Sequence, residues 1–503
     1  MRRSDYLLTF LGALMLAMSR TPLHLGWLVF FAWIPFLVIF ERGFAKPRQL
    51  IKLGAITSVV YVLIVYYWFS IVTVPGLIGM LLLFVVVYWL FFLAIHRIYA
   101  SLPRFRYLGF ICVMLTFEYI QNYGETRFPW FNIAYSLADY NVLVQIADLI
   151  GVMGISLLIM VVNVLIFRIR KNTLSSAIAL LLIFSAWFGY GVYCLKTIEL
   201  KEHDAGIYVM QPSIDQDVKW EPEQYGKSMQ LFRKLTLQAA ADSAKLVIYP
   251  EGAVTDYLAQ RPSIREDMQA IIDTARVDVF TGFPDYSAAP IDYPGEVYHY
   301  NAASLVQQDG TENVVYHKNI LVPVAERMLF LDIFPFLWKL QLGQANWEFG
   351  TELAFYESGG YRFSPSICYE LAFPDIFHRM TIPRDAATKK LNKCDYHVNL
   401  TNDAWLGTSY GPWLHAMMTR FRAVENRIQI YRCANTGISL IVDPKGKILQ
   451  KTRLYEVKNI TAPLYTTPRI PFIRHIYKYP WGLVFIALAL LIIAIIKKPE
   501  RLL

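Results

Sequence analysis

Long apolar stretches alternate with short polar connections over the first 195 residues, and one more apolar stretch lies near the end of the chain. A helix needs about 20 apolar residues to cross a bilayer, so the longer stretches are typical of transmembrane helices and the shorter ones are weaker candidates. The pattern predicts a membrane α-helical bundle of about eight spans, at about 5–19, 26–40, 54–74, 76–95, 108–120, 151–167, 176–195 and 480–496.

A different pattern fills the region between the last two spans. Short β-rich runs such as "AGIYVMQ", "AKLVIYPEG", "YRFSPSICYE" and "CDYHVNLTNDAW" alternate with helical patterns at 222–243, 262–276 and 412–427. Strands that alternate with helices predict an α/β or layered α+β domain. We therefore expect a transmembrane bundle at 1–200, a globular domain at 201–468, and a final span with a tail at 469–503.

Lysine and arginine gather at both ends of the chain and in every second loop between the predicted spans. Five such clusters begin at Arg2, Arg42, Arg97, Arg168 and Lys497. Because basic residues favour the cytoplasmic side, the pattern predicts two cytoplasmic termini and a globular domain on the outer face. The first stretch is basic and then apolar like a signal peptide, but no clear small-residue cleavage pattern follows, so we keep it as a span.

Composition narrows the chemistry. The net charge of +9 is largely explained by the basic loop clusters, and no nucleic-acid motif is present. The nine histidines form no HExxH or clustered His/Cys spacing, so we expect no metal site. Five cysteines are an odd number. A Cys394–Cys433 disulfide would leave Cys368 free, although sequence does not establish that pair.

Three reactive side chains follow apolar strands. "YPEGAV" presents Glu251, "YHKNILVPVAE" presents Lys318, and "SPSICYE" presents Cys368. If one sheet edge holds all three, the carboxylate can take the thiol proton, the ammonium can lower the thiol pKa and stabilise an oxyanion, and the thiolate can attack a carbonyl. Each residue alone is ordinary, because a lone cysteine is usually a buried apolar group and a lone Glu or Lys a solvated charge.

Together, and in this order, these motifs resemble the nitrilase superfamily, whose Glu–Lys–Cys triad lies on an α-β-β-α sandwich. The chain is most similar to its membrane branch, the apolipoprotein N-acyltransferases. The similarity also includes "RFPWFNIAYS", "QPSIDQDVKW", "LTNDAWLG", "HAMMTRFRAVENR" and "ANTGISLIVD". It implies a nitrilase-like α/β domain outside the cytoplasm, attached to the bundle.

The resemblance also implies roles for single residues. Glu251 matches the general base, Lys318 the lysine on the oxyanion side, and Cys368 the acylated nucleophile. Four further residues match supporting or substrate-binding positions: Glu326 beside the lysine, Tyr369 and Glu370 after the cysteine, and Trp220 in "VKWEP", for which simple packing is the alternative.

Three positions depart from the family pattern. Gly252 stands where serine is common, Ala325 where glycine usually precedes the glutamate, and Arg127 where the membrane motif normally has glycine. None of them belongs to the triad, but Gly252 and Ala325 lie beside it in sequence.

The function implied by the resemblance is N-acyl transfer in the bacterial inner membrane. A phospholipid would donate an acyl chain to Cys368, and the thioester would pass it to the α-amino group of a diacylated apolipoprotein, with no cofactor and with a monomer sufficing. The alternative is a membrane-anchored nitrilase-type amidase that uses water. A lipid-binding or transport protein with an inactive enzyme domain is a rival of another class, but it predicts a broken triad.

One apolar segment remains, "RMLFLDIFPFLWKL" at 327–340, directly after the lysine motif. It is too short and interrupted to span a bilayer. We expect a loop that dips into the outer leaflet or lines an acyl groove, with an ordinary core helix as the alternative.

Overall fold

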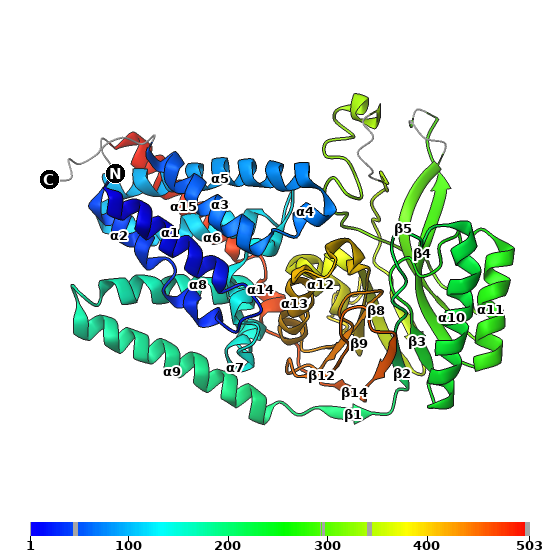
Figure 1. Ribbon diagram of the computed structural model, residues 1–503. Helices are drawn as coiled ribbons and strands as arrows, with labels where there is room; N and C mark the ends of the chain where they lie inside the picture. The colour runs from blue at the N-terminus through cyan, green and yellow to red at the C-terminus, as the bar shows by residue number, and fades with distance from the viewer. Residues whose placement is uncertain (1, 44–48, 292, 294–296, 340–344, 498–503) are drawn as a thin grey trace.

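A helical part and an α/β part make up the protein (Figure 1). The structure, a computed structural model, describes residues 2–43, 49–291, 293, 297–339 and 345–497. The chain begins in the helical part, passes through the α/β part, and returns to the helical part with its last helix (Figure 1).

Helices occupy the apolar stretches of the sequence. Their bounds are α1 (Arg3–Met18), α2 (Ile34–Arg42), α3 (Leu50–Val65), α4 (Phe69–Val72), α5 (Val74–Ser101), α6 (Arg106–Ile120), α7 (Asn141–Val144), α8 (Ala147–Arg168), α9 (Thr173–Thr197), α14 (Ile473–Ile476) and α15 (Pro480–Ile496). Among the described residues, α5, α8 and α9 are long and apolar enough to cross a membrane, whereas α3 and α15 are apolar but shorter. The number of eight spans therefore stays a prediction.

Two six-stranded sheets form the centre of the α/β part. The first has the order β13-β2-β3-β4-β5-β6 and the second the order β12-β11-β10-β9-β8-β7. The strands are β2 (Ile207–Gln211), β3 (Leu246–Ile248), β4 (Asp278–Ala288), β5 (Val297–Val306), β6 (Tyr316–His317), β7 (Tyr356–Ser358), β8 (Tyr361–Ile367), β9 (Tyr396–Thr401), β10 (Gln429–Ala434), β11 (Leu440–Val442), β12 (Ile448–Lys451) and β13 (Lys458–Thr461). A separate pair, β1 (Lys201–His203) and β14 (Leu464–Thr466), follows α9.

The two sheets pack face to face between two layers of helices. Rings of Phe280 on β4 and Phe363 on β8 meet between the sheets, with centroids 5.1 Å apart. Helices α10 (Pro222–Ala241) and α11 (Pro262–Ala275) cover the outer face of the first sheet, while α12 (Pro374–Thr381) and α13 (Gly411–Asn426) lie between the second sheet and the helical part (Figure 1). The expected α-β-β-α sandwich is therefore present.

Parallel pairing explains why reactive residues gather at one edge. Strands β2, β3 and β4 run parallel in one sheet, and β8, β9 and β10 run parallel in the other. The carboxyl ends of parallel strands are where side chains of open sheets meet. Glu251 follows β3, Cys368 follows β8 and Asn402 follows β9.

Buried polar contacts fix the α/β part to the helical part. Arg427, directly after α13, pairs with Asp148 of α8 at 2.8 Å, and both side chains are almost fully buried. On α13 itself, Arg422 donates to the Tyr135 hydroxyl at 2.7 Å, and Glu425 accepts from the Val152 amide at 2.5 Å.

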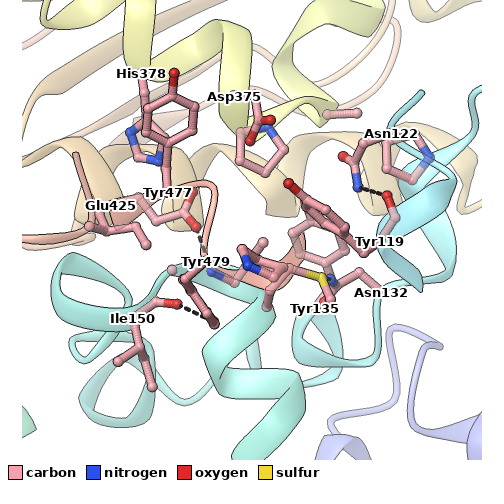
Figure 2. A pocket seen from close by; sticks show the side chains of 18 residues that line it. Tyr119, Asn122, Asn132, Tyr135, Ile150, Asp375, His378, Glu425, Tyr477 and Tyr479 are labelled. Atoms are coloured by element: carbon pink, nitrogen blue, oxygen red, sulfur yellow. Dashed lines mark hydrogen bonds between the residues drawn. The ribbon is translucent and has the colours of Figure 1, made fainter. Parts of the chain in front are cut away.

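A small cavity lies at this junction (Figure 2). Tyr119, Asn132 and Tyr135 line it from the helical part, and Asp375 and His378 line it from the α/β part. None of its lining residues belongs to the predicted triad, so the cavity is a feature of the junction and separate from the reactive residues.

Two open questions from the sequence are answered by the fold. Cys394 and Cys433 are both free and buried, and their sulfurs contact different carbonyls, that of Met380 for Cys394 and those of Met210 and Ile248 for Cys433. The segment 327–340 is not a core helix. It forms turns and a short 3-10 helix, Pro335–Lys339, and it exposes 63% of Ile333 and 68% of Phe336; Leu340 lies outside the described residues.

Candidate active site

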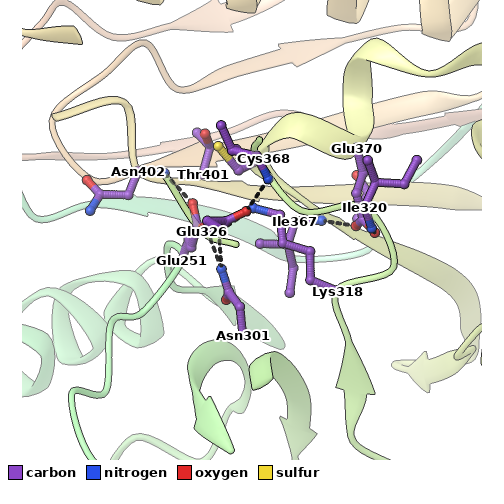
Figure 3. Close-up of polar contacts among 12 residues, drawn as sticks. Glu251, Asn301, Lys318, Ile320, Glu326, Ile367, Cys368, Glu370, Thr401 and Asn402 are labelled. Carbon is purple, nitrogen blue, oxygen red and sulfur yellow. Dashed lines mark hydrogen bonds and ion pairs between the residues drawn. The ribbon is translucent and has the colours of Figure 1, made fainter. Parts of the chain in front are cut away.

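Cys368 lies at the first residue after β8, on a sharp turn. Its φ of +50° is left-handed, a conformation that costs a non-glycine residue about 1–2 kcal/mol and persists only where the surroundings hold it. Asn399 and His415 hold it here, because both side chains donate toward the Cys368 carbonyl, at 3.5 and 3.2 Å. The turn presents the thiol at the edge of the sheet (Figure 3).

Lys318 connects two carboxylates at the same edge. Its Nζ lies 2.8 Å from Oε1 of Glu326 and 3.5 Å from Oε1 of Glu251, and the lysine is 1% exposed. Asn301 on β5 donates to the same two oxygens, at 2.7 Å to Glu251 and 3.2 Å to Glu326 (Figure 3). The ammonium is thus held between two acids next to Cys368.

Two main-chain contacts orient Glu251. The amide of Asn402, after β9 of the opposite sheet, donates to Oε2 of Glu251 at 2.8 Å. The buried Nζ of Lys219 donates to the Glu251 carbonyl at 3.0 Å. The Asn402 amide thus holds one carboxylate oxygen, and Lys219 holds the main chain that carries the side chain. Both contacts restrict the position of the carboxylate, as a general base requires.

Burial raises the pKa of the Cys368 thiol, and the Glu251 carboxylate raises it further, while Lys318 acts in the opposite direction. The net direction is upward, so the sequence expectation of a lowered thiol pKa is wrong. Burial alone would lower the pKa of Lys318, but Glu326 and Glu251 outweigh it and hold that pKa above its ordinary value. At neutral pH the site therefore rests as a thiol beside an ammonium, and the thiol needs a base to react.

Glu370 ties the nucleophile turn to the lysine turn. Its fully buried carboxylate accepts from the Ile367 amide at 2.7 Å, from the Asn319 amide at 2.7 Å and from the Tyr316 hydroxyl at 2.8 Å. Burial raises the Glu370 pKa to about 7, and these donors limit the rise. Glu370 therefore positions Cys368 and Lys318 relative to each other through the backbone on both sides.

Tyr369 and Trp220 lie at the edge of the candidate active site. Tyr369 is buried and donates its hydroxyl to the carbonyl of Arg127, so it connects the nucleophile turn to the helical part. Trp220 is 48% exposed and lies near Gly252, the residue after Glu251. The exposed part of its ring can touch a ligand above the Glu251 turn, and the rest lies against Lys219, whose Nζ is 5.8 Å from the ring centroid.

Two of the three departures from the family pattern border the site. Gly252 has a φ of +56°, and a Cβ there would only touch Lys219 and Trp220 at ordinary distances, so the conformation and not the space favours glycine. Ala325 is exposed beside Glu326. Both positions can therefore change the surroundings of the acids without breaking their contacts.

Sequence reasoning missed a second polar cluster behind Cys368. His415 on α13 contacts Oδ1 of Asp403 at 2.9 Å, and Arg432 on β10 pairs with Oδ2 of Asp403 at 2.8 Å. These residues lie in or beside the quoted motifs "LTNDAWLG" and "HAMMTRFRAVENR", which carried the resemblance without an assigned role. A histidine, an aspartate and a cysteine on different elements give no spacing that a sequence can reveal.

The same cluster offers the ligand atoms of a metal site, but it already holds a positively charged group. The Cys368 sulfur, an Asp403 oxygen and a His415 nitrogen all lie within 4.8 Å of one another. The Arg432 guanidinium, however, binds Asp403 at 2.8 Å and lies 3.0 Å from Nδ1 of His415. A fixed cation at that point opposes a second one, so the cluster fits a hydrogen-bond network better than a metal centre.

Comparison with known proteins agrees with this geometry. Residues 12–165 match the apolipoprotein N-acyltransferase N-terminal domain, and residues 209–464 match the carbon-nitrogen hydrolase family. An apolipoprotein N-acyltransferase of Geobacter metallireducens is 29% identical over 477 residues, which is 90% of this chain and 88% of that protein. One from Chlorobaculum tepidum is 26% identical over 93% of this chain and 92% of that protein.

Among solved structures, a CN-hydrolase superfamily protein of Xanthomonas campestris covers 57% of this chain and 97% of its own, with 17% identity and a TM-score of 0.38. The resemblance inferred from the motifs is confirmed by the two family matches, which together cover most of the helical part before α9 and nearly all of the α/β part. The chain therefore belongs to the carbon-nitrogen hydrolase family, in the branch that carries an apolipoprotein N-acyltransferase N-terminal domain.

Proposed function

We propose that the protein moves a fatty acyl chain from a phospholipid, through a thioester on Cys368, to the α-amino group of a diacylglyceryl-modified cysteine at the N-terminus of a lipoprotein. The observation that carries this proposal is the cluster of Glu251, Lys318 and Cys368 at one sheet edge, in a chain whose helical part matches the N-acyltransferase domain. The relatives named above, both apolipoprotein N-acyltransferases, match this chain over most of their length.

In the first half of the reaction Glu251 takes the thiol proton as the Cys368 sulfur attacks the ester carbonyl of the phospholipid. The Lys318 ammonium and a backbone N–H, which we assign to Tyr369, stabilise the oxyanion. The tetrahedral intermediate then breaks its C–O bond, and protonated Glu251 returns the proton to the leaving alkoxide. A thioester and a lysophospholipid result.

In the second half the neutral α-amino group of the lipoprotein attacks the thioester. Glu251 removes a proton from the attacking nitrogen, the C–S bond breaks, and the thiol regains a proton. The products are an amide and the free enzyme, so the cycle is ping-pong and needs no redox partner. Glu326 serves to hold Lys318 in place, at 2.8 Å, through both halves.

We further propose a multi-pass protein of the bacterial inner membrane with eight spans, cytoplasmic termini and the catalytic domain on the periplasmic side. The alternation of basic loops supports this orientation. The apolar helices α5, α8 and α9 support embedding in the membrane. A monomer suffices, because one chain supplies every residue of the proposed mechanism.

The alternative is hydrolysis, in which water discharges the same thioester. The two reactions differ only in the acceptor, and the matching helical domain favours the transferase.

Intact-mass measurement of the protein distinguishes acyl transfer from hydrolysis. The purified protein is incubated with phospholipid, treated in part with hydroxylamine, and then given a diacylated lipopeptide, beside Cys368→Ala as the matched control. We expect a hydroxylamine-labile acyl adduct that Cys368→Ala lacks and that the lipopeptide discharges. An adduct that water clears before the lipopeptide is added would establish a hydrolase, and a folded protein without an adduct would remove Cys368 from the mechanism.

A further inference from the structure

The loop that follows α6 brings an arginine to the nucleophile turn. Tyr369, the residue after Cys368, donates its hydroxyl to the Arg127 carbonyl at 2.7 Å. The rings of Phe128 and Tyr369 lie nearly parallel, with centroids 6.5 Å apart and an interplanar angle of 27°. Arg127 is therefore fixed, through its own carbonyl and through Phe128, against the residue that follows Cys368.

The Arg127 side chain forms no ion pair with the residues that the structure describes. It makes no side-chain hydrogen bond with them either, although it is partly buried. The fully buried arginines of the α/β part behave differently, because Arg422, Arg427 and Arg432 pair with Glu425, Asp148 and Asp403. Burial lowers the pKa of Arg127, while Tyr369 and Glu125 raise it only in part.

Glu125, the acid whose charge raises the Arg127 pKa, has another contact. Glu125 accepts from the amide of Phe330, the first exposed aromatic residue of the apolar segment 327–339. This contact holds the loop of Arg127 against a surface that exposes Phe330, Ile333 and Phe334. A partly buried guanidinium, on a loop that contacts an exposed apolar segment, matches a molecule with an anionic head and apolar chains.

We propose that Arg127 binds the phosphodiester of the phospholipid acyl donor. The proposal rests on the proposed function and adds the donor's headgroup site to it. In a glycerophospholipid the phosphate and the reacting ester share one glycerol unit, so an ester at Cys368 places the phosphate close to the residues around Tyr369. A guanidinium binds phosphate oxygens in a bidentate manner, which gives both charge and orientation.

The reaction itself makes the proposal specific. The diacylglyceryl group of the acceptor is joined to cysteine by a thioether and carries no phosphate. Arg127 should therefore act in acylation of Cys368 by a phospholipid and not in transfer to the amine. An acyl donor without a phosphate should not need Arg127 at all.

The test compares wild type, Arg127→Gln and Arg127→Lys with Arg233→Gln, an exposed arginine on α10, as the control. Cys368 acylation is followed by intact mass with phosphatidylglycerol in detergent micelles, and separately with the p-nitrophenyl ester of the same fatty acid. The third measured rate is that of acyl transfer from the preformed acyl-enzyme to a lipopeptide. Thermal unfolding of each variant checks its fold.

For Arg127→Gln we expect phospholipid-dependent acylation to fall about 10- to 100-fold, with the p-nitrophenyl ester and discharge rates within about twofold of wild type. Arg127→Lys should keep part of the rate, and Arg233→Gln all of it. Equal losses with both donors would make Arg127 a support for Tyr369 and overturn the proposal, as would no loss with either.

A free-phosphate site would give another result. Inorganic phosphate would then change the p-nitrophenyl ester rate of wild type and not of Arg127→Gln, and this outcome also overturns the assignment to a lipid. If wild type forms no adduct with either donor, the acyl-transfer proposal itself fails and the Arg127 proposal fails with it. That result differs from every outcome in which wild type is acylated.

Discussion

Nε2 of His415 lies 3.2 Å from the carbonyl oxygen of Cys368, so a residue of α13 holds the backbone of the nucleophile. A carbonyl oxygen can only accept, and therefore Nε2 carries the hydrogen. Burial lowers the pKa of His415, and Arg432 lowers it further against the opposing effect of Asp403. The ring thus donates through Nε2, and its Nδ1 faces Arg432 and Asp403.

Loss of this donor should slow acylation without weakening lipid binding. In His415→Ala the Cys368 carbonyl loses the closer of its two side-chain donors and keeps the longer contact to Asn399, so the left-handed turn at φ +50° is less well held. We expect the single-turnover acylation rate at saturating phospholipid to fall about 10- to 100-fold, with the half-saturating lipid concentration nearly unchanged.

His415→Gln is the matched variant, because its amide can donate as Nε2 does. It should recover part of the rate. Equal losses in both variants would instead assign His415 to ring packing against Trp130, whose centroid lies 5.4 Å away.

The raised thiol pKa predicts a particular pH dependence of Cys368 alkylation. Because the pKa of the Cys368 thiol lies above its ordinary value, the thiol stays protonated at neutral pH. Alkylating reagents react with the thiolate. The rate with iodoacetamide should rise about tenfold per pH unit through pH 9 without a plateau. Mass spectrometry of the quenched protein gives the rate, and a plateau near neutral pH would indicate a preformed thiolate.

Glu251→Gln should change two reactions in opposite directions. The Glu251 carboxylate raises the Cys368 pKa, so its neutral replacement lowers that pKa and speeds alkylation at pH 7. The same change removes the general base, and acylation by phospholipid should fall about 10²- to 10⁴-fold. Both rates can be measured on one preparation. A parallel loss of both would mean that the variant disturbs the turn and does not act through the proton.

The ion pair at the junction should contribute strongly to stability. Asp148→Asn leaves the guanidinium of Arg427, which is fully buried, without its charged partner. Removal of one partner from a buried pair costs about 3–5 kcal/mol, so the thermal unfolding midpoint in detergent should fall by several degrees.

Asp256→Asn is the control for that measurement. Its partner Arg261 is 57% exposed, and pairs of this kind contribute about 0–1 kcal/mol. If both substitutions shift the midpoint equally, the Arg427–Asp148 pair does not hold the two parts together.

The clustering of Glu251, Lys318 and Cys368 at one sheet edge could be predicted from sequence, because each of them closely follows an apolar strand or β-rich run. The α-β-β-α fold was also predictable, since its motifs are collinear with a known family. The residues that orient these three side chains could not be predicted from sequence. Asn402 acts through its backbone amide, which any residue type provides, and His415 reaches Cys368 from a helix 47 positions later in the chain.

The direction of the Cys368 pKa shift is a second property that could not be predicted from sequence. Sequence indicates that Lys318 lies near Cys368, and a nearby cation lowers a thiol pKa. Only the fold shows that Cys368 is also desolvated and faces Glu251, and these two effects outweigh the cation. Burial is a property of the packed structure, so the sign of a competition between burial and charge cannot be obtained from residue order.

The exposed apolar segment 327–339 gives the last prediction. Ile333, Phe334 and Phe336 expose 63%, 47% and 68% of their surface, which is costly in water and favourable in a lipid leaflet. Replacement of both phenylalanines by serine should therefore slow acylation of Cys368 by phospholipid in vesicles at least about tenfold. The rate with a short-chain p-nitrophenyl ester in solution should stay within about twofold, because the triad is untouched. Equal slowing with both donors would show that the segment supports the fold of the site, through Glu326 and Arg327 at its start, and does not engage the lipid.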